Sequence, residues 1–294
     1  MAERAILVTG ATGHIGSHLV RELQREGRRV RALSRSSSGE DTVETVQGNV
    51  LDRGSLTAAL EDVGAAYYLV HALASGGGFG DEELQGARNF ADAAREAGVE
   101  RIVYLGGLAR GENLSDHLRA RQQVGEILRS SGVLTIEFRA SVVIGEGSAS
   151  FELVRGLVDY LPALVLPSWI ENECQPIALD DVVAYLVAAL DVRVPGSAVF
   201  EIGGADRITY RRLLEEYARA AGLDRPSIAL PAIPLPFSSW LTSVAPEQVR
   251  VWAKLADSLR FDSAVEDEAA LHAFDVRPRG VREAIRAVVP VSAT

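Results

Sequence analysis

The fold of this chain is decided by the stretch Thr9-Gly10-Ala11-Thr12-Gly13-His14-Ile15-Gly16. The apolar residues 5–8 precede it and predict a β-strand, and residues 17–26 follow it and predict a helix. A strand, a glycine-rich turn and a helix in this order are the context in which such a fingerprint indicates dinucleotide binding. The alternative is an ordinary tight turn between a strand and a helix.

Each glycine of the fingerprint has its own expected role. We expect Gly10 to permit the tight turn, and Gly13, which has no Cβ, to let the backbone approach a pyrophosphate. Gly16 would let the helix lie close against the strand. Free N–H groups at the helix start, together with the helix dipole, would then hold the anion. The cofactor contacts predicted here are Gly10, Thr12, Gly13, His14, Ile15 and Gly16.

The composition of the chain argues against several other classes of protein. Its 294 residues are 47% hydrophobic, which suffices for a sizeable core, and no apolar run reaches the roughly 18 residues of a membrane span. The net charge of −10 argues against nucleic-acid binding. The lone cysteine, Cys174, cannot form an intramolecular disulfide, and no Cys/His cluster has metal-ligand spacing. Because the first strand also begins too early for a signal peptide, we expect a cytoplasmic protein without a metal site. The oligomeric state stays open.

The end of the second predicted strand, residues 28–34, favours NADP(H) over NAD(H). NAD-preferring sites usually place an acidic residue there, whereas this chain has Ser34, Arg35 and Ser36. The Arg35 guanidinium could pair with a 2′-phosphate; the alternative is a solvated arginine in a serine-rich turn. The following turn, residues 48–52, would lie under the adenine, with Asn49 and Val50 in contact with it, and it could also end in a helix cap.

Strands and helices alternate after the fingerprint. The further predicted strands are residues 43–50, 65–71, 101–105 and 134–144, and the further predicted helices are residues 55–62, 82–97, 115–130 and 182–190. This repetition predicts an α/β fold, a Rossmann-type doubly wound parallel sheet with a smaller C-terminal substrate-binding lobe. We expect residues 1–145 to form the NADP(H)-binding Rossmann domain and residues 146–294 the lobe, with residues 175–200 returning to the Rossmann sheet.

The fingerprint, the turn Gly48-Asn49-Val50-Leu51-Asp52 and His71 at a strand end together resemble the extended and atypical short-chain dehydrogenases. The NmrA-like NAD(P)H-binding branch is the most similar, over about residues 4–222. The resemblance implies a Rossmann fold and a nicotinamide cofactor. We add His71 and Gly106 to the predicted cofactor contacts, although His71 could equally be a capped strand end.

The usual catalytic residues of that family are missing. Its members ordinarily reduce carbonyls with a Ser, a Tyr and a Lys, the last two spaced as Tyr-x-x-x-Lys. Here the only lysine is Lys254, His117 and Arg121 stand at the matching helix positions, and Gly106-Gly107 stands where the serine would be. The ordinary mechanism is therefore out of reach, while the cofactor site looks whole.

His117 and Arg121 are the candidate catalytic residues, since positions i and i+4 share one face of a helix. Arg121 could hold the nicotinamide ribose hydroxyls but cannot donate a proton at neutral pH. His117 could give a proton to an alkoxide. The alternative is a surface helix that carries a His and an Arg. We interpret Asp180 and Asp181 as helix caps, and residues 74–80 as either a lid with Phe79 or a surface connection.

Two functions fit these residues. The first is an NADPH-dependent ketoreductase of a bulky aromatic, polyketide-like ketone or quinone, similar to the angucyclinone-tailoring enzymes of antibiotic biosynthesis that lack the triad. The proton would come from a substrate hydroxyl, a water or His117. The second is a noncatalytic NADP(H)-sensing regulatory protein of the NmrA-like type. The first is favoured, and the apolar, proline- and tryptophan-rich residues 226–252 are consistent with a large flat substrate.

Overall fold

The computed structural model describes residues 4–35, 43–70, 79–111, 114–161, 163–230, 239, 255 and 257–289. A seven-stranded sheet runs through it in the order β11-β6-β5-β4-β1-β2-β3, and every neighbouring pair is parallel. The strands are β1 (Ala5–Thr9), β2 (Val30–Ser34), β3 (Glu44–Gln47), β4 (Val63–Tyr68), β5 (Arg101–Gly107), β6 (Leu134–Ala140) and β11 (Ala198–Ile202). The order reverses between β1 and β4, which makes this the switch point of a doubly wound sheet. The predicted fold class is confirmed.

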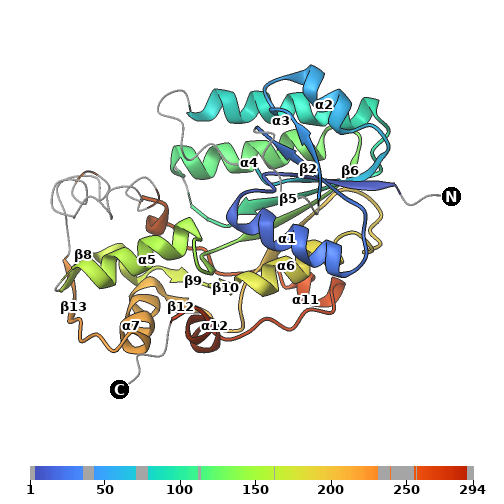
Figure 1. Cartoon of the computed structure of the whole chain (residues 1–294). Coiled ribbons are helices and arrows are strands. Elements are labelled where there is room, and N and C mark those ends of the chain that lie inside the picture. The colour runs from blue at the N-terminus through green and yellow to red at the C-terminus, as the bar shows by residue number, and fades with distance from the viewer. Residues whose placement is uncertain are drawn as a thin grey trace.

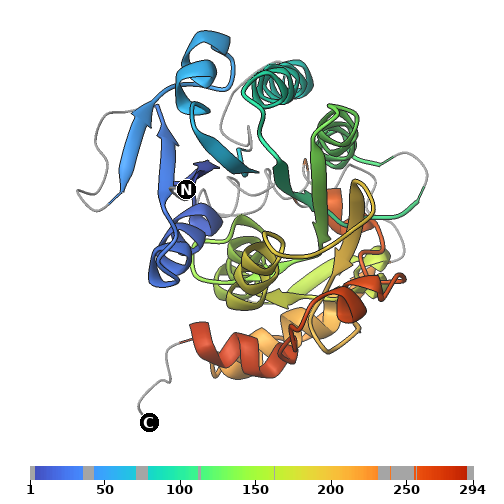
Figure 2. The same cartoon turned by 90° about the vertical axis from the view of Figure 1, so that its right-hand side faces the viewer.

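Helices cover both faces of the sheet (Figure 1). One face carries α2 (Arg53–Ala59), α3 (Phe79–Glu96) and α4 (Asp116–Arg129), and the other carries α1 (His14–Arg25), α6 (Leu179–Ala188) and α11 (Ala269–Ala273). Figure 2, turned by 90°, shows the same two layers. Each layer has its own core: Phe90 and Leu128 are fully buried in the first, and Leu19 and Leu186 in the second. Burial of each such side chain stabilises the fold by about 1.5–3 kcal/mol.

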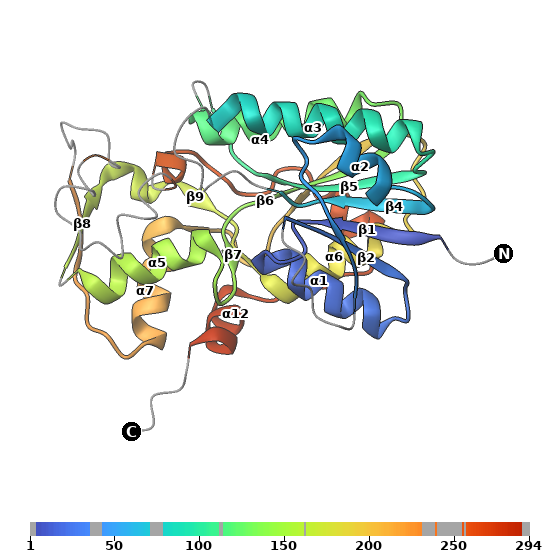
Figure 3. The same ribbon diagram turned by 45° about the horizontal axis from the view of Figure 1, so that its top comes forward.

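A smaller lobe lies beyond the carboxyl ends of the strands, opposite the N-terminus (Figure 3). It contains α5 (Ala149–Tyr160), β8 (Leu164–Pro167), α7 (Tyr210–Ala220), β13 (Ser227–Leu230) and α12 (Val281–Val288). Its separate core buries Phe151, Leu213 and Ile285. The division of the chain at residue 145 stays a prediction, and β11 belongs to the main sheet by its pairing with β6.

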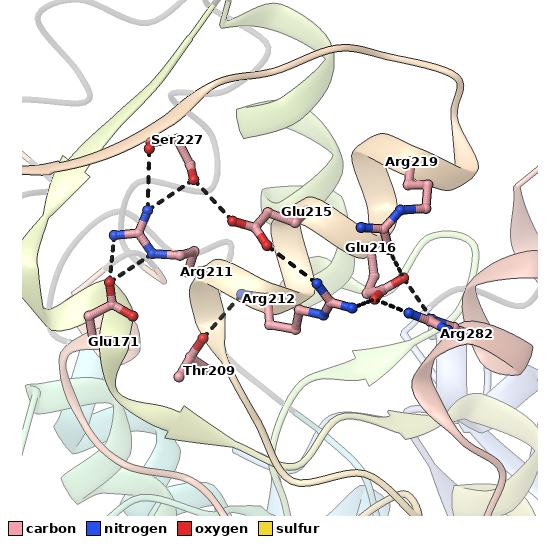
Figure 4. Close-up of polar contacts among 9 residues, drawn as sticks. All are labelled: Glu171, Thr209, Arg211, Arg212, Glu215, Glu216, Arg219, Ser227 and Arg282. Carbon is pink, nitrogen blue, oxygen red and sulfur yellow. Dashed lines mark hydrogen bonds and ion pairs between the residues drawn. The ribbon is translucent and has the colours of Figure 1, made fainter.

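Helix α7 is tied to its neighbours by an ion-pair network (Figure 4). At its start, the Thr209 hydroxyl accepts a hydrogen bond from the Arg212 N–H at 3.2 Å. Farther along the helix, Glu216 lies between Arg212, Arg219 and Arg282, and its 3.0 Å hydrogen bonds with Arg282 join α7 to α12. Burial raises the pKa of Glu216, but the hydrogen bonds from Arg282 and Arg219 outweigh that effect and lower it overall. Tyr210, the first residue of α7, is held separately, because its backbone N–H donates to the Asn172 carbonyl at 3.1 Å.

The single strand predicted over residues 134–144 is wrong. Strand β6 ends at Ala140, and β7 (Val143–Ile144) pairs instead with β10 (Ile177–Ala178). The chain therefore leaves the main sheet at Ser141. A run of apolar residues predicts an extended backbone, but the hydrophobic pattern does not show with which strand each part of the run pairs.

The cap interpretation of Asp180 and Asp181 is also wrong. Helix α6 begins at Leu179, three residues before the predicted start, its N-cap is Ala178, and neither carboxylate caps it. Asp181 instead accepts hydrogen bonds from the Arg279 N–H at 2.8 Å and from Arg279 Nε at 3.0 Å. This pairing spans almost a hundred residues, so local sequence rules cannot reveal it.

The lid that we predicted falls mostly outside the described residues, because residues 71–78 are not among them. Helix α3 begins at Phe79, three residues earlier than expected, so Phe79 and Gly80 belong to a helix. Asp81 and Glu82 lie in its first turn, where negative charge stabilises a helix start. No helix in the described parts of the chain is long and apolar enough to cross a membrane, and no group of His, Cys, Asp or Glu there could hold a metal ion.

Candidate active site

A cavity of about 710 Å³ opens at the switch point of the sheet. It is lined by the turn after β1, by the end of β4, and by the residues that follow β5 and β6. The predicted site residues that line it are Gly10, Thr12, Gly13, His14, Ile15, Gly16, Ser34, Arg35, Asn49, Val50, Gly106, His117 and Arg121. Two more predicted contacts, Ser36 and His71, lie outside the described residues. The sheet therefore brings most of the candidate residues into one cavity.

The fingerprint forms a cradle that only glycine permits. Gly10 has a φ of +68°, and a Cβ there would lie 2.6 Å from the Leu69 carbonyl oxygen. A Cβ on Gly16 would lie 2.1 Å from the carbonyl oxygen of Gly10. Both distances are far below van der Waals contact with backbone atoms, so side chains at either position would push the turn apart. This close backbone packing fits a dinucleotide-binding turn.

Helix α1 presents an open N-terminus to the cavity. Its N-cap is Gly13, which has no side chain to cap the first N–H groups, and its first turn contains no acidic residue. The first turn also contains His14, whose buried Nε2 has no hydrogen-bond partner among the described residues. Burial and the neighbouring His18 lower the pKa of His14, so the ring is neutral at pH 7. Unpaired donors and a positive dipole end are what a pyrophosphate requires.

The predicted adenosine end of the cavity contains Arg35 and Asn49. The Arg35 side chain is exposed, and its carbonyl oxygen accepts a hydrogen bond from Gln47 Nε2 at 3.3 Å, which fixes the end of β2. The Asn49 Oδ1 accepts from the Leu51 N–H at 3.1 Å, which orients the side chain and leaves its amide NH₂ as a donor for a ligand. Asp52 caps α2 by accepting from the Gly54 N–H at 2.9 Å, which confirms the predicted cap.

Arg121 lies at the opposite end of the cavity. It is 9% exposed, its terminal nitrogen donates to the Leu105 carbonyl, and its buried Nε has no partner among the described residues. A Cβ on Gly107 would lie in ordinary van der Waals contact with this Nε, at 3.4 Å, so the Arg121 side chain runs beside the end of β5. Arg121 thus presents a positive charge and a free donor where the family places its lysine.

His117 is a poor proton donor at neutral pH. Burial, together with the positive charge of Arg121 one turn away, lowers its pKa to about 4. Less than one imidazole in a hundred is then protonated at pH 7, and a neutral imidazole is a very weak acid. The position of His117 on the cavity wall fits the prediction, whereas its electrostatic environment disfavours the role of acid.

Glu83, an acidic residue of this cavity, was not among the residues predicted from the sequence. Glu83 comes from α3, lines the cavity and is 7% exposed. Burial raises the pKa of its carboxyl, although the charge of Arg121 opposes the shift. The helical pattern of residues 82–97 gives no reason to single out Glu83 from its acidic neighbours, because only the packing of α3 against α4 shows which of them turns inward.

Three hydroxyl residues, Ser141, Ser263 and Tyr210, also line the cavity and were missed. Each comes from a different part of the chain: the end of β6, the segment after residue 260, and the start of α7. Around them the wall is apolar, with Val142, Leu153 and Leu259. No motif joins positions so far apart in the sequence.

The profile of the NmrA-like family matches residues 2–146. Divinyl chlorophyllide a 8-vinyl-reductase of Zea mays is 31% identical over 224 residues, and the match covers 69% of this chain but only 55% of that protein. Ceramide reductase of Caulobacter vibrioides is 28% identical and covers 78% of this chain and 74% of its own. The chain thus spans about half the length of the maize relative and three quarters of the bacterial one.

Solved structures share the fold over almost the whole chain. NADPH-dependent quinone oxidoreductase QOR2 of Escherichia coli, complexed with NADPH, has a TM-score of 0.75 at 19% identity, covering 96% of this chain and 99% of that one. MoeE5 in complex with UDP-glucuronic acid and NAD has a TM-score of 0.73 at 20% identity, covering 97% of each chain. At these identities the likeness shows that the fold is shared. The chain is an atypical short-chain dehydrogenase/reductase whose N-terminal half matches the NmrA-like family.

Proposed function

We propose that this protein is an NADPH-dependent reductase of a carbonyl on a bulky aromatic compound, a polyketide-like ketone or a quinone. The observation that carries the proposal is the single cavity that joins the glycine cradle to an apolar wall of Val142, Leu153 and Leu259. Reductases among the sequence relatives, and a quinone oxidoreductase among the structural neighbours, support the reaction type. When bound, the reduced nicotinamide supplies the hydride.

The choice of NADPH rests on Arg35. Arg35 lines the cavity at the end of β2, and the neighbouring side chain, Ser34, carries no negative charge. A 2′-phosphate would pair with the guanidinium, whereas the ribose 2′-hydroxyl of NADH would meet no carboxylate acceptor at this position.

The residues of this cavity are better suited to binding the carbonyl group than to giving it a proton. His117 is neutral at pH 7, because its pKa is lowered to about 4. We therefore infer that the alkoxide formed on hydride addition takes its proton from a hydroxyl of the substrate or from water. A phenol hydrogen-bonded to the ketone would pass its proton to the alkoxide and regain one from solvent. Glu83, whose carboxyl pKa is raised by burial, is a titratable group of the cavity wall that could serve instead.

The deciding experiment compares two substrates, a polycyclic ketone with a neighbouring phenol and the same ketone with that phenol methylated. NADPH oxidation is followed by absorbance, with wild-type protein, His117→Phe and Glu83→Gln. We expect rapid reduction of the phenol, little reduction of its methyl ether, and retained activity in both variants. Undiminished turnover of the ether, with loss of activity in one variant, would assign the proton to that residue instead.

A noncatalytic NADP(H) sensor is the second candidate. It is favoured by one observation: His117 and Arg121 stand where the resemblance expects the catalytic tyrosine and lysine, and the lowered pKa of His117 leaves its ring uncharged at pH 7. Binding of NADPH without turnover of any quinone or ketone would support this function over the reductase.

A further inference from the structure

A chain of three hydroxyl groups reaches the cavity wall. The Tyr210 hydroxyl lies 2.7 Å from Ser263 Oγ, and Ser263 Oγ lies 2.6 Å from Ser141 Oγ. Both distances lie in the short part of the range for hydrogen bonds between hydroxyls. Tyr210 is 4% exposed and Ser263 is 3% exposed, whereas Ser141, at the end of the chain, is only partly buried. The most accessible member is therefore the one directly after β6.

Counting hydrogens shows what Ser141 can offer. Ser263 has one hydroxyl hydrogen and two hydroxyl neighbours, so it donates to one and accepts from the other. If Tyr210 donates to Ser263, then Ser263 donates to Ser141, and the hydrogen of Ser141 is left for a ligand. The other direction would leave Tyr210 to donate to the Phe261 carbonyl, whose oxygen is 3.3 Å away and at the long end for such a bond. The geometry favours a chain that ends in a free donor at Ser141.

The register of the sheet places this donor at the catalytic end. Ala140, which precedes Ser141, pairs with Gly107 of β5, and the Arg121 guanidinium packs against Gly107. Ser141, His117 and Arg121 all line the same cavity. The resemblance to the dehydrogenase family expects a serine after β5, where this chain has Gly106-Gly107. Ser141 supplies a hydroxyl from the next strand of the sheet.

We propose that Ser141 donates a hydrogen bond to the carbonyl oxygen of an aromatic ketone or quinone, and that Ser263 and Tyr210 orient the Ser141 hydroxyl. The inference rests on the proposed function in its choice of substrate class. In this arrangement Ser141 is a catalytic residue, because it touches the reacting oxygen, and the other two are positioning residues. The hydrogen bond from Ser141 polarises the carbonyl and stabilises the charge that develops on its oxygen.

The hydroxyl chain polarises the carbonyl but does not release a proton. Burial raises the pKa of Tyr210, so a tyrosinate is strongly disfavoured at the far end. A proton passed outward through Ser141 would leave that tyrosinate behind. The alkoxide therefore keeps its hydrogen bond to Ser141 and takes its proton from the substrate hydroxyl or from water. The reaction stays balanced without an ionised side chain.

The test measures binding in the absence of turnover. Wild-type protein saturated with NADP⁺, which has no hydride to give, is titrated with anthraquinone and with anthracene, and the two dissociation constants are compared. A neutral hydrogen bond contributes about 0.5–1.5 kcal/mol, so we expect the preference for the quinone to fall by about 2- to 12-fold in Ser141→Ala. Ser141→Thr should restore it. Ser130→Ala, on the surface of the protein, is the control for the substitution itself.

Turnover gives a second, separate readout. With a reducible ketone, Ser141→Ala should lower kcat by about 100-fold or more, as the loss of an oxyanion donor does, with an unchanged pH profile. Tyr210→Phe keeps the ring in place and should lower kcat by less. If Ser141→Ala keeps both the preference for the quinone and the wild-type kcat, the inference about Ser141 is overturned, and the proposed reductase function is unaffected. A preference that depends on Ser141, without any turnover, would uphold the inference and reject the reductase. A Tyr210→Phe variant identical to wild type would overturn the orienting role.

Discussion

Replacement of Arg35 by alanine should weaken the preference of this protein for NADPH over NADH. The side chain lines the cavity at the end of β2, and its backbone is fixed independently by the hydrogen bond from Gln47. The substitution therefore removes the guanidinium without disturbing the strand. A charge-assisted hydrogen bond contributes about 1.5–3 kcal/mol, which corresponds to about a 13- to 160-fold rise in the dissociation constant of NADPH. Since Arg35 is exposed and solvent screens its charge, we expect the lower part of that range.

The assay is a fluorescence titration of wild type and Arg35→Ala with NADPH and with NADH, at low and at high salt. NADH affinity should change by less than about 2-fold, because no 2′-phosphate is present to lose a partner. Arg21→Ala removes the same charge from the exposed side of α1 and serves as the control. Equal affinities of wild-type protein for the two cofactors would refute the assignment of Arg35.

Three further predictions follow from the cradle, the buried histidine and the ion-pair network. Gly16→Ala should abolish cofactor binding in a titration, because its Cβ would lie 2.1 Å from a backbone oxygen; a variant that binds normally would contradict the cradle. The pKa of His117 is lowered to about 4 in the folded protein. Between pH 6.5 and pH 4 the imidazole is therefore protonated in the unfolded chain and neutral in the folded one. In chemical denaturation, the free energy of unfolding should decrease as the pH is lowered through this range, by up to about 1.4 kcal/mol per pH unit, and less steeply in His117→Phe. Equal slopes for the two proteins would disprove the shift. The pKa of Glu216 is lowered, so its network stabilises the fold above the ordinary pKa of a glutamate and is lost as the pH falls through the lowered value. Glu216→Gln should therefore lower the melting temperature at pH 7 more than at pH 3; an equal loss at both would remove the ionic explanation.

The backbone features of the proposed nucleotide half of the site were predictable because they are local. The tight turn at Gly10, the missing acid beside Arg35 and the cap at Asp52 each depend on residues a few positions apart. The same holds for the doubly wound sheet, whose strand and helix periods are short.

The catalytic half was not predictable in the same way. Glu83 faces the cavity only because α3 packs on α4, and Ser141 reaches it only because the chain leaves the main sheet after Ala140. Tyr210 and Ser263 meet across more than fifty residues. The low pKa of His117 depends on burial, which composition and spacing do not report.

The most direct test of the central claim is isotope transfer. NADPH that carries deuterium at the reactive carbon of its nicotinamide is incubated with the protein and a polycyclic aromatic ketone, and the product is examined by mass spectrometry. The reductase that we propose should place the deuterium on the former carbonyl carbon, and Arg35→Ala should slow that transfer at limiting cofactor. Tight binding of NADPH with no deuterium in any ketone or quinone offered would contradict the claim.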